Sequence, residues 1–225
     1  MVLNFGIWIE PEMANTTSEL YEKHPEWVLK APNREIVLGR GGTQVVLDLS
    51  NPEVQDFIFG IVDNLMTTYP EIDYIKWDAN MSILNHGSQY LPSDQQSHMY
   101  IEYHEGFKKV CERIRAKYPD LTLQACASGG GRANYGVMPY FDEFWVSDNT
   151  DALQRIYMQW GTSSFFPAIA MASHISADPQ PSNIPGHSPK ISDRRSDERP
   201  FGHGDPTQKY DRRRENTLPQ GDRRL

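Results

Sequence analysis

The sequence is poor in cysteine, in basic residues and in long apolar segments. Its 225 residues include two cysteines, Cys111 and Cys126, which are too few for a disulfide scaffold and lack the spacing of metal ligands. The formal net charge of -8 argues against a nucleic-acid partner, because binding a phosphate backbone needs a basic surface. No apolar run reaches the length of a membrane span. The sequence therefore predicts no nucleic-acid partner and no membrane partner.

The chain has enough residues for one domain with a sizeable hydrophobic core. Its first residues, MVLNFGIWIEPEM, lack a basic n-region and carry glutamates where a signal peptide would continue to be apolar. Cytoplasmic localisation is therefore the default expectation. A strand-like apolar run begins at residue 5 with no element before it, which predicts that upstream sequence is missing.

Strand-like runs alternate with segments of helical periodicity through about residue 178. The predicted strands cover residues 5–10, 44–49, 71–78, 121–125, 141–146 and 165–175. The predicted helices cover residues 18–23, 52–66, 93–117 and 152–160, the last one stopped by Gly161. Strands that alternate with helices indicate βαβ units and a parallel α/β sheet.

The pattern is lost at about Pro179. Residues 179–225 carry ten Lys and Arg against seven Asp and Glu, together with seven prolines and only scattered apolar residues. Such a segment cannot bury an apolar face. We therefore expect a structured domain over residues 1–178 and a disordered tail over 179–225, and we hypothesise that the tail is an out-of-frame translation.

Polar side chains follow four of the predicted strands. Because the carboxyl ends of parallel strands share one edge of a sheet, we expect these groups to lie close together. They are Trp8 and Glu10, Lys76 and Asp78, residues 126–132, and Asp148 and Asp151. Two carboxylates on separate strand ends, about 5–5.5 Å apart, are what retaining glycoside hydrolysis requires.

Asp78 is the candidate nucleophile and Asp148 the candidate acid/base. Lys76 lies two residues from Asp78, and a neighbouring ammonium lowers the pKa of a carboxyl group; a simple strand-end salt bridge is the alternative. Asp148 has no adjacent cation, and a nearby Asp78 carboxylate would raise its pKa, as an acid catalyst requires. The alternative for Asp148 is a cap on the helix predicted from residue 152.

Residues 128–132, Ser-Gly-Gly-Gly-Arg, allow backbone amides to approach a ligand, although a turn without a ligand is an alternative. Trp8 fits a sugar platform or the core, and Cys126 fits a small buried residue. Glu10 and Glu12 with His174 lack the spacing of metal ligands. The sequence predicts no metal.

Five segments together resemble glycoside hydrolase family 36, the α-galactosidase family that also includes raffinose and stachyose synthases. The resemblance extends over about residues 4–178. The segments are FGIWIEPEM (5–13), GRGGTQVVLDLSNPEV (39–54), YIKWDAN (74–80), CASGGGR (126–132) and WVSDNTDALQRIYMQWGTS (145–163).

The resemblance implies an incomplete (β/α)8 TIM-type barrel that hydrolyses terminal α-galactosyl residues of galacto-oligosaccharides with retention of configuration. It implies that Asp78 is the nucleophile and Asp148 the acid/base, with neither a metal nor another cofactor. The residues that match family positions around galactose are Trp8, Arg40, Lys76, Cys126, Ser128 and Gly129.

The family's Asp-Asp pair belongs to a strand before Phe5 and is absent, as are the family's N-terminal β-sandwich and C-terminal β-domain. We therefore expect this chain alone to be inactive or barely active. A galactosyltransferase of the raffinose or stachyose type, and a non-catalytic galactoside-binding chain, are the alternative functions. The resemblance leaves a homo-oligomer open for a longer parent protein.

Overall fold

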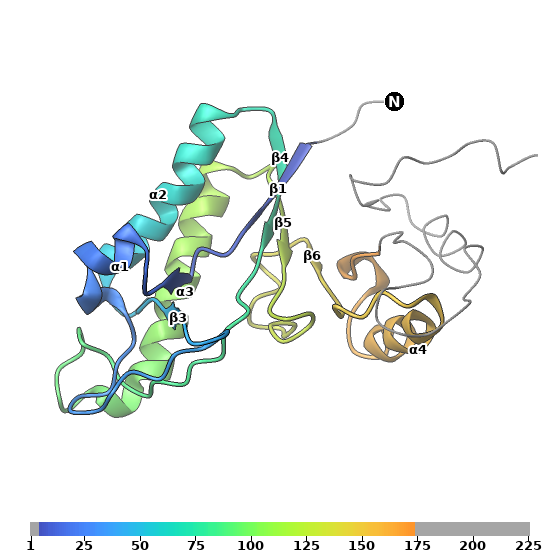
Figure 1. Ribbon diagram of the computed structural model, residues 1–225. Coiled ribbons are helices and arrows are strands. Elements are labelled where there is room, and N and C mark those ends of the chain that lie inside the picture. The colour runs from blue at the N-terminus through green and yellow to red at the C-terminus, as the bar shows by residue number, and fades with distance from the viewer. Residues whose placement is uncertain (1–4, 174–225) are drawn as a thin grey trace, which may run out of the picture. The chain divides into compact units, whose positions relative to one another are not determined.

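The computed structural model describes residues 5–173, and its main feature is a parallel four-stranded sheet. The strands are β1 (Phe5–Ile9), β4 (Ile72–Trp77), β5 (Thr122–Ala125) and β6 (Glu143–Phe144). They are hydrogen-bonded in the order in which they occur along the chain, and each pair is parallel (Figure 1). The predicted parallel α/β architecture is therefore confirmed for the part of the chain that the structure describes.

Two long helices join these strands. Helix α2 (Pro52–Thr68) leads from β1 towards β4, and α3 (Met99–Lys117) leads from β4 to β5. The predicted start of α2 is confirmed, because the Asn51 side chain accepts a hydrogen bond from Glu53 N at 2.9 Å and Pro52 opens the first turn. The two helices lie side by side on one face of the sheet (Figure 1).

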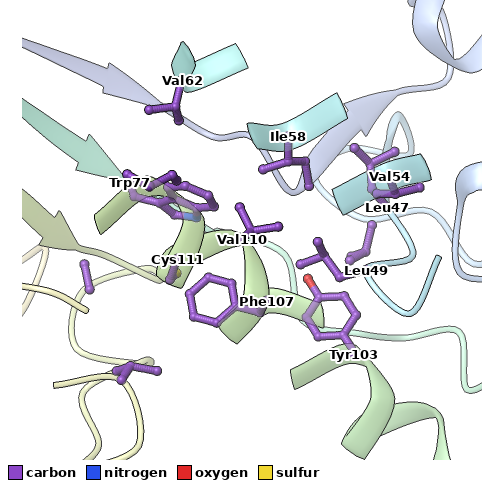
Figure 2. Close-up of a cluster of buried hydrophobic side chains, with 14 of the residues drawn as sticks. Leu47, Leu49, Val54, Ile58, Val62, Trp77, Tyr103, Phe107, Val110 and Cys111 are labelled. Atoms are coloured by element: carbon purple, nitrogen blue, oxygen red, sulfur yellow. The ribbon is translucent and has the colours of Figure 1, made fainter. Parts of the chain in front are cut away.

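The hydrophobic core lies between this face of the sheet and the two helices. Residues that alternate along β4 and β5 point towards the helices, because successive side chains of a strand lie on opposite faces. Trp77 is 1% exposed, and its ring meets that of Phe107 edge to face at 5.9 Å between centroids. Figure 2 shows this cluster, whose labelled members are Leu47, Leu49, Val54, Ile58, Val62, Trp77, Tyr103, Phe107, Val110 and Cys111.

The predicted run at 44–49 lies outside the parallel sheet. It forms β3 (Gln44–Val46), which pairs antiparallel with β2 (Met13–Asn15), a strand that the sequence did not predict. The segment between these two strands contains α1 (Glu19–Lys23), where a short helix was predicted, and a 3-10 turn, η1 (Pro25–Trp27); the Ser18 side chain caps α1. Residues 10–51 therefore form a separate segment between β1 and α2 that lies outside the parallel sheet.

Several predicted boundaries are wrong. The helix predicted from residue 93 begins with a 3-10 turn, η2 (Gln96–His98), and α3 itself starts at Met99. The strand predicted over 141–146 is only the two residues of β6. Gly161 does not stop α4 (Ala152–Ser163), because the roughly 1 kcal/mol cost of one glycine in a helix is small beside its hydrogen bonds.

The strand predicted over 165–175 is also wrong within the described residues. Residues 168–170 form a 3-10 turn, η3 (Ala168–Ala170), and only Met171 makes a bridge, to Phe144. Pro167, which has no N–H to give to a ladder, starts this turn. Residues 174–175 and the tail over 179–225 lie outside the described residues.

The chain divides into two compact units. Residues up to 149 together with 157–172 form the first, which contains the whole parallel sheet, and the described part of the second is 150–156 with residue 173. Among the described residues, no helix has the length and apolar character needed to cross a membrane.

Candidate active site

The face of the sheet opposite α2 and α3 is polar. One register row across the four strands consists of Trp8, Lys76, Gln124 and Glu143. The Glu143 carboxylate accepts hydrogen bonds from Gln124 Nε2 and from the hydroxyl of Tyr74, each at 2.7 Å. The sheet therefore presents hydrogen-bonding side chains that lead up to the carboxyl ends of its strands.

Asp78 directly follows β4 and is only 6% exposed. Its Oδ2 accepts a hydrogen bond from Trp8 Nε1 at 3.0 Å, and its Oδ1 accepts one from Ala79 N at 2.9 Å. Burial raises the pKa of Asp78, but hydrogen bonds from the side chains of Asn80, Trp8 and Cys126 and from the Ala79 backbone outweigh it and hold the pKa below its ordinary value. Asp78 is therefore ionised at neutral pH.

The cause of this ionisation differs from the sequence-based prediction. Lys76 was expected to lower the pKa of Asp78, but the largest lowering contributions come from the neutral donors Asn80, Trp8 and Cys126. The Lys76 ammonium lies 4.0 Å from the centroid of the Trp145 ring, which is a cation–π contact. Lys76 and Asp78 form no salt bridge in the described structure, so the alternative role of a strand-end ion pair is also wrong.

The segment after β5 brings Cys126 and Ser128 to the same edge as Asp78. Cys126 is 1% exposed, and burial raises the pKa of its thiol to about 12, which makes it a protonated hydrogen-bond donor rather than a nucleophile. Ser128 is exposed, and its N–H donates to Asn80 Oδ1 at 2.9 Å. The end of β5 is thereby tied to the end of β4.

The glycines after Ser128 have a structural reason that the sequence did not reveal. Gly129 has φ +87°, and a methyl group there would lie 2.9 Å from Ser147 Cα and 3.2 Å from Asp148 N. A methyl group at Gly130 would lie 2.8 Å from the carbonyl oxygen of Val146. The glycines therefore let the β5 loop pack against the backbone after β6, which places Gly129 beside Asp148.

Asp148 is exposed in the segment after β6, where its Oδ1 accepts a hydrogen bond from Trp145 Nε1 at 3.0 Å. The alternative role predicted for it, capping α4, belongs to Asp151. Oδ1 of Asp151 accepts hydrogen bonds from Leu153 N at 3.1 Å and Gln154 N at 2.9 Å. Asp148 is thus an accessible carboxylate that does not provide this cap.

Trp8 and Arg40 both lie at exposed positions. Trp8 is 51% exposed, so its alternative role as a core residue is wrong. Arg40 lies in a tight turn over residues 39–44 and has φ +42°, which is a strained conformation for a residue with a side chain. At the base of this turn, Gln44 Nε2 donates to Glu10 Oε2 at 3.0 Å. The turn that carries Arg40 is therefore joined to the end of β1.

A buried charge network lies under these strand ends. Glu12 is fully buried and accepts hydrogen bonds from Trp77 Nε1 at 2.7 Å, from the Tyr103 hydroxyl at 2.6 Å and from both terminal nitrogens of Arg132. Burial raises the pKa of Glu12, but the Arg132 guanidinium and these hydrogen bonds outweigh it and lower the pKa. Glu12 therefore belongs to an ion pair, and among the described residues no group of His, Cys, Asp and Glu could hold a metal.

The model of the melibiase family matches residues 1–190. The chain belongs to the melibiase family. Among curated relatives, α-galactosidase AgaA of Geobacillus stearothermophilus is 42% identical over 177 residues, which are 79% of this chain and 24% of the relative. Probable α-galactosidase C of Aspergillus flavus is 45% identical over 177 residues, 79% of this chain and 22% of the relative.

Solved structures of the family have the same fold. An α-galactosidase from Lactobacillus brevis gives a TM-score of 0.80 at 38% identity, covering 84% of this chain and 25% of that one. GH36 α-galactosidase AgaA from G. stearothermophilus gives 0.79 at 39% identity, with coverage of 84% and 26%. The predicted membership of glycoside hydrolase family 36 and the barrel fold class are therefore confirmed. This melibiase-family chain spans about a quarter of the length of the relatives that it matches.

Sequence reasoning about this melibiase-family chain missed Asn80 and the Glu12–Arg132 pair. Asn80 lies in the YIKWDAN segment, two residues after the candidate nucleophile Asp78. This proximity in sequence was the one available signal that Asn80 belongs to the site. Glu12 and Arg132 are 120 positions apart, and nothing in their spacing indicates that they meet. Their pairing depends on the packing of the segments after β1 and β5, which single-sequence patterns do not encode.

Proposed function

We propose that the protein hydrolyses terminal α-galactosyl residues of galacto-oligosaccharides with retention of configuration, with Asp78 as the nucleophile and Asp148 as the acid/base. One observation carries the proposal. A buried carboxylate held ionised by neutral donors lies at the end of β4, and an exposed carboxylate lies in the segment after β6, with only β5 between these strands.

In the first step, an Asp78 oxygen attacks the anomeric carbon of the galactosyl unit. The bond to the leaving oxygen breaks, and that oxygen takes the proton of Asp148. In the second step, Asp148 removes a proton from water, the water oxygen attacks the anomeric carbon, and Asp78 leaves as a carboxylate. The hydrogen bonds from Trp8 to Oδ2 and from Ala79 to Oδ1 hold the plane of the attacking carboxylate.

The sheet geometry supports this pairing. Neighbouring strands are about 4.8 Å apart, so the backbones of β4 and β6 are separated by about twice that distance. The carboxylates of retaining enzymes are roughly 5–5.5 Å apart, so the proposal requires the two side chains to extend towards each other over β5. Asn80, two residues after Asp78, accepts a hydrogen bond from Ser128 N, and the neighbouring Gly129 lies against the backbone of Asp148.

Two structures of the relative AgaA support the same residues. Its complex with raffinose carries an aspartate replaced by asparagine, and its complex with stachyose carries an aspartate replaced by alanine. The two replaced aspartates are 70 positions apart, the same spacing as Asp78 and Asp148 in this chain. We infer α-galactoside oligosaccharides as the substrate class of this protein.

The proposed sugar contacts follow from the position of each residue. The exposed indole of Trp8 offers a flat apolar face next to Asp78, which suits stacking on a pyranose ring. The other residues proposed to bind galactose hydroxyls, through side chains or backbone groups at the strand ends, are Arg40, Lys76, Cys126, Ser128 and Gly129.

Covalent labelling tests the nucleophile without requiring turnover. A galactose-configured epoxide, opened by attack of the nucleophile on the carbon equivalent to the anomeric centre, is incubated with the 225-residue chain, and the labelled peptide is mapped by mass spectrometry. We expect an ester on Asp78, none in Asp78→Asn, and slower labelling in Asp148→Asn, because the epoxide oxygen then lacks its proton donor. Labelling of any other carboxylate would contradict the proposal.

The same experiment separates the alternative functions. A non-catalytic galactoside-binding protein would bind 1-deoxygalactonojirimycin, a ligand of the relative AgaA, and yet form no ester. A galactosyltransferase would form the ester, but with raffinose as donor and a high concentration of acceptor sugar it would yield the longer oligosaccharide rather than free galactose. We expect free galactose as the main product of any turnover.

A further inference from the structure

We propose that Trp145 is a positioning residue for Asp148: its indole N–H holds Oδ1 of the carboxyl group, so that Oδ2 carries the proton given to the leaving oxygen. The catalytic role rests on the proposed function, because it takes Asp148 as the acid/base. The contact does not rest on it, since Trp145 Nε1 and Asp148 Oδ1 are hydrogen-bonded at 3.0 Å whatever reaction the site performs.

The indole makes the two oxygens of the Asp148 carboxyl group different. An indole nitrogen can only donate a hydrogen bond, so Oδ1 is the acceptor whether the group is ionised or protonated. In a protonated carboxyl group the carbonyl oxygen is the better acceptor. The hydroxyl is then at Oδ2, the oxygen that the indole does not hold, and the proton to be transferred has one defined position.

The indole can define this position because its own place is fixed. The Trp145 N–H donates to the carbonyl oxygen of Ala125 at 2.9 Å, at the end of β5. The Lys76 ammonium lies 4.0 Å from the centroid of the ring, which is a cation–π contact. Lys76 lies on β4 two residues before Asp78, so one ring connects the strand that ends at the proposed nucleophile with the proposed acid/base.

The backbone around Asp148 is fixed as well. Gly129 lies so close to Ser147 Cα and Asp148 N that a methyl group on it would be 2.9 and 3.2 Å from them. Ser147 Oγ accepts a hydrogen bond from Asn149 N at 3.1 Å. The χ2 angle of an aspartate is otherwise broadly distributed, so the hydrogen bond from Trp145 selects one orientation of the carboxyl group. A general acid held in this way needs no reorientation before it reacts.

NMR of the indole groups tests the contact without any reaction. The five tryptophans of the 225-residue chain are labelled with 15N at Nε1, and Trp145→Phe assigns the Trp145 signal. In Asp148→Ala we expect this N–H signal to move upfield and to exchange faster with water, because its acceptor is lost. Asp120→Ala, in the exposed turn before β5, is the matched control and should leave the signal unchanged. A Trp145 signal that responds equally to both variants overturns the inference.

Two covalent reagents test the positioning role, because only one of them needs an acid. In a galactose-configured epoxide, an Asp78 oxygen attacks carbon, the C–O bond breaks, and the freed oxygen takes the proton of Asp148. In 5-fluoro-α-galactosyl fluoride, the same attack expels fluoride, which leaves without a proton from Asp148. In Trp145→Phe we expect ester formation from the epoxide to slow roughly 10-fold or more, and that from the fluoride by no more than about twofold.

Two further proteins isolate the effect of the N–H group. Trp160→Phe makes the same change at a position 75% exposed on α4 and should leave both labelling rates unchanged. Replacement of the Trp145 indole by benzothiophene, through cell-free incorporation of 3-benzothienylalanine, keeps the fused ring but has no N–H. It should reproduce the result of Trp145→Phe, and it decides the matter if Trp145→Phe no longer unfolds cooperatively.

Equal slowing of the two reagents when the N–H is removed would overturn the inference, because the hydrogen bond would then serve only the turn at residues 145–148. Unchanged labelling by the epoxide would overturn it too. A wild-type chain that forms neither ester contradicts the proposed function and, with it, the catalytic role of Trp145. The indole signal still decides in that case whether Trp145 holds the Asp148 carboxyl group.

Discussion

The fully buried Glu12 carboxylate forms an ion pair with Arg132, whose side chain is 16% exposed, and this pair joins the segment after β1 to the end of the loop after β5. The same carboxylate accepts a hydrogen bond from the indole of Trp77, the residue that precedes Asp78. The Arg132 guanidinium also lies 4.5 Å from the centroid of the Phe107 ring in α3. One ion pair therefore holds three of the segments that carry the candidate active site.

Removing the cation should destabilise the protein strongly. In Arg132→Met the Glu12 carboxylate stays buried without its partner, and breaking a buried pair in this way costs about 3–5 kcal/mol. Urea unfolding measures the loss. The double variant Glu12→Met with Arg132→Met serves as the control, because replacing both charges with apolar side chains is often close to neutral. A double variant as unstable as the single one would show that lost packing, not the unpaired charge, is the cause.

The contribution of Glu12 to the pH dependence of stability should change sign in Arg132→Met. In the wild type its pKa is lowered by Arg132, so this carboxylate contributes stability that is present above its unfolded pKa and lost as pH falls through the folded value. In Arg132→Met burial, the largest contribution, raises the pKa against only the hydrogen bonds from Trp77 and Tyr103, so the variant should lose less stability than the wild type on acidification. Parallel curves of unfolding free energy against pH would contradict this prediction.

Trp8 should tune the nucleophile as well as bind sugar. Trp8→Phe keeps an aromatic face but removes the N–H that donates to Asp78 Oδ2, so the pKa of Asp78 should rise from its lowered value. The ionised form is the proposed nucleophile, so activity should be lost as pH falls through this pKa. The acid limb of kcat/KM should therefore move to higher pH. Trp160→Phe, at a position 75% exposed on α4, is the matched control. An unmoved acid limb with weaker binding would leave Trp8 as a sugar platform only.

The elements with strong periodicity could be predicted from the sequence. Helix α2 has an apolar stripe and a capped start, and β4 alternates buried and accessible side chains, so local physics fixes both. Because parallel strands place their carboxyl ends at one edge, the grouping of Trp8, Asp78 and Ser128 also follows from the strand assignments.

The remaining features depend on contacts between distant segments. β2 has three residues and forms only because β3 pairs with it. The loop after β4 is polar and long, and its side chains bind it to the rest of the fold. Asn85 exchanges two hydrogen bonds with the Val37 backbone, and Ser88 donates to the buried Asp48. A polar composition indicates a loop but does not show whether its polar groups face a ligand or the protein.

Gly129 should be required for the position of Asp148. In Gly129→Ala the methyl group would lie 2.9 Å from Ser147 Cα, and the residue would also keep a φ of +87°, so two costs add. Gly42→Ala is the matched control, because Gly42 has φ +83° and open space around it. We expect about 1 kcal/mol of destabilisation in the control from backbone strain alone and more in Gly129→Ala. Equal losses in thermal unfolding would show that the close approach to residues 147–148 has no energetic role.

Two measurements distinguish the roles of Asp148, the proposed acid/base, and Asp151, the cap of α4. Asp151→Ala removes two hydrogen bonds at the start of α4 and should cost about 1 kcal/mol or more in thermal unfolding. Asp148→Ala removes an exposed carboxylate and should leave the unfolding free energy nearly unchanged.

The rates of galactoside cleavage should show the opposite pattern. In Asp148→Ala, cleavage of raffinose should fall by roughly 10²–10⁴-fold, because the sugar leaving group needs a proton donor. Formation of the galactosyl–enzyme from a 2,4-dinitrophenyl α-galactoside should fall far less, since that leaving group departs without protonation. Asp151→Ala should slow the cleavage of both substrates equally, in proportion to the unfolded fraction. If Asp148→Ala instead slowed both equally, Asp148 would be a structural residue and the acid would have to be sought elsewhere at the strand ends.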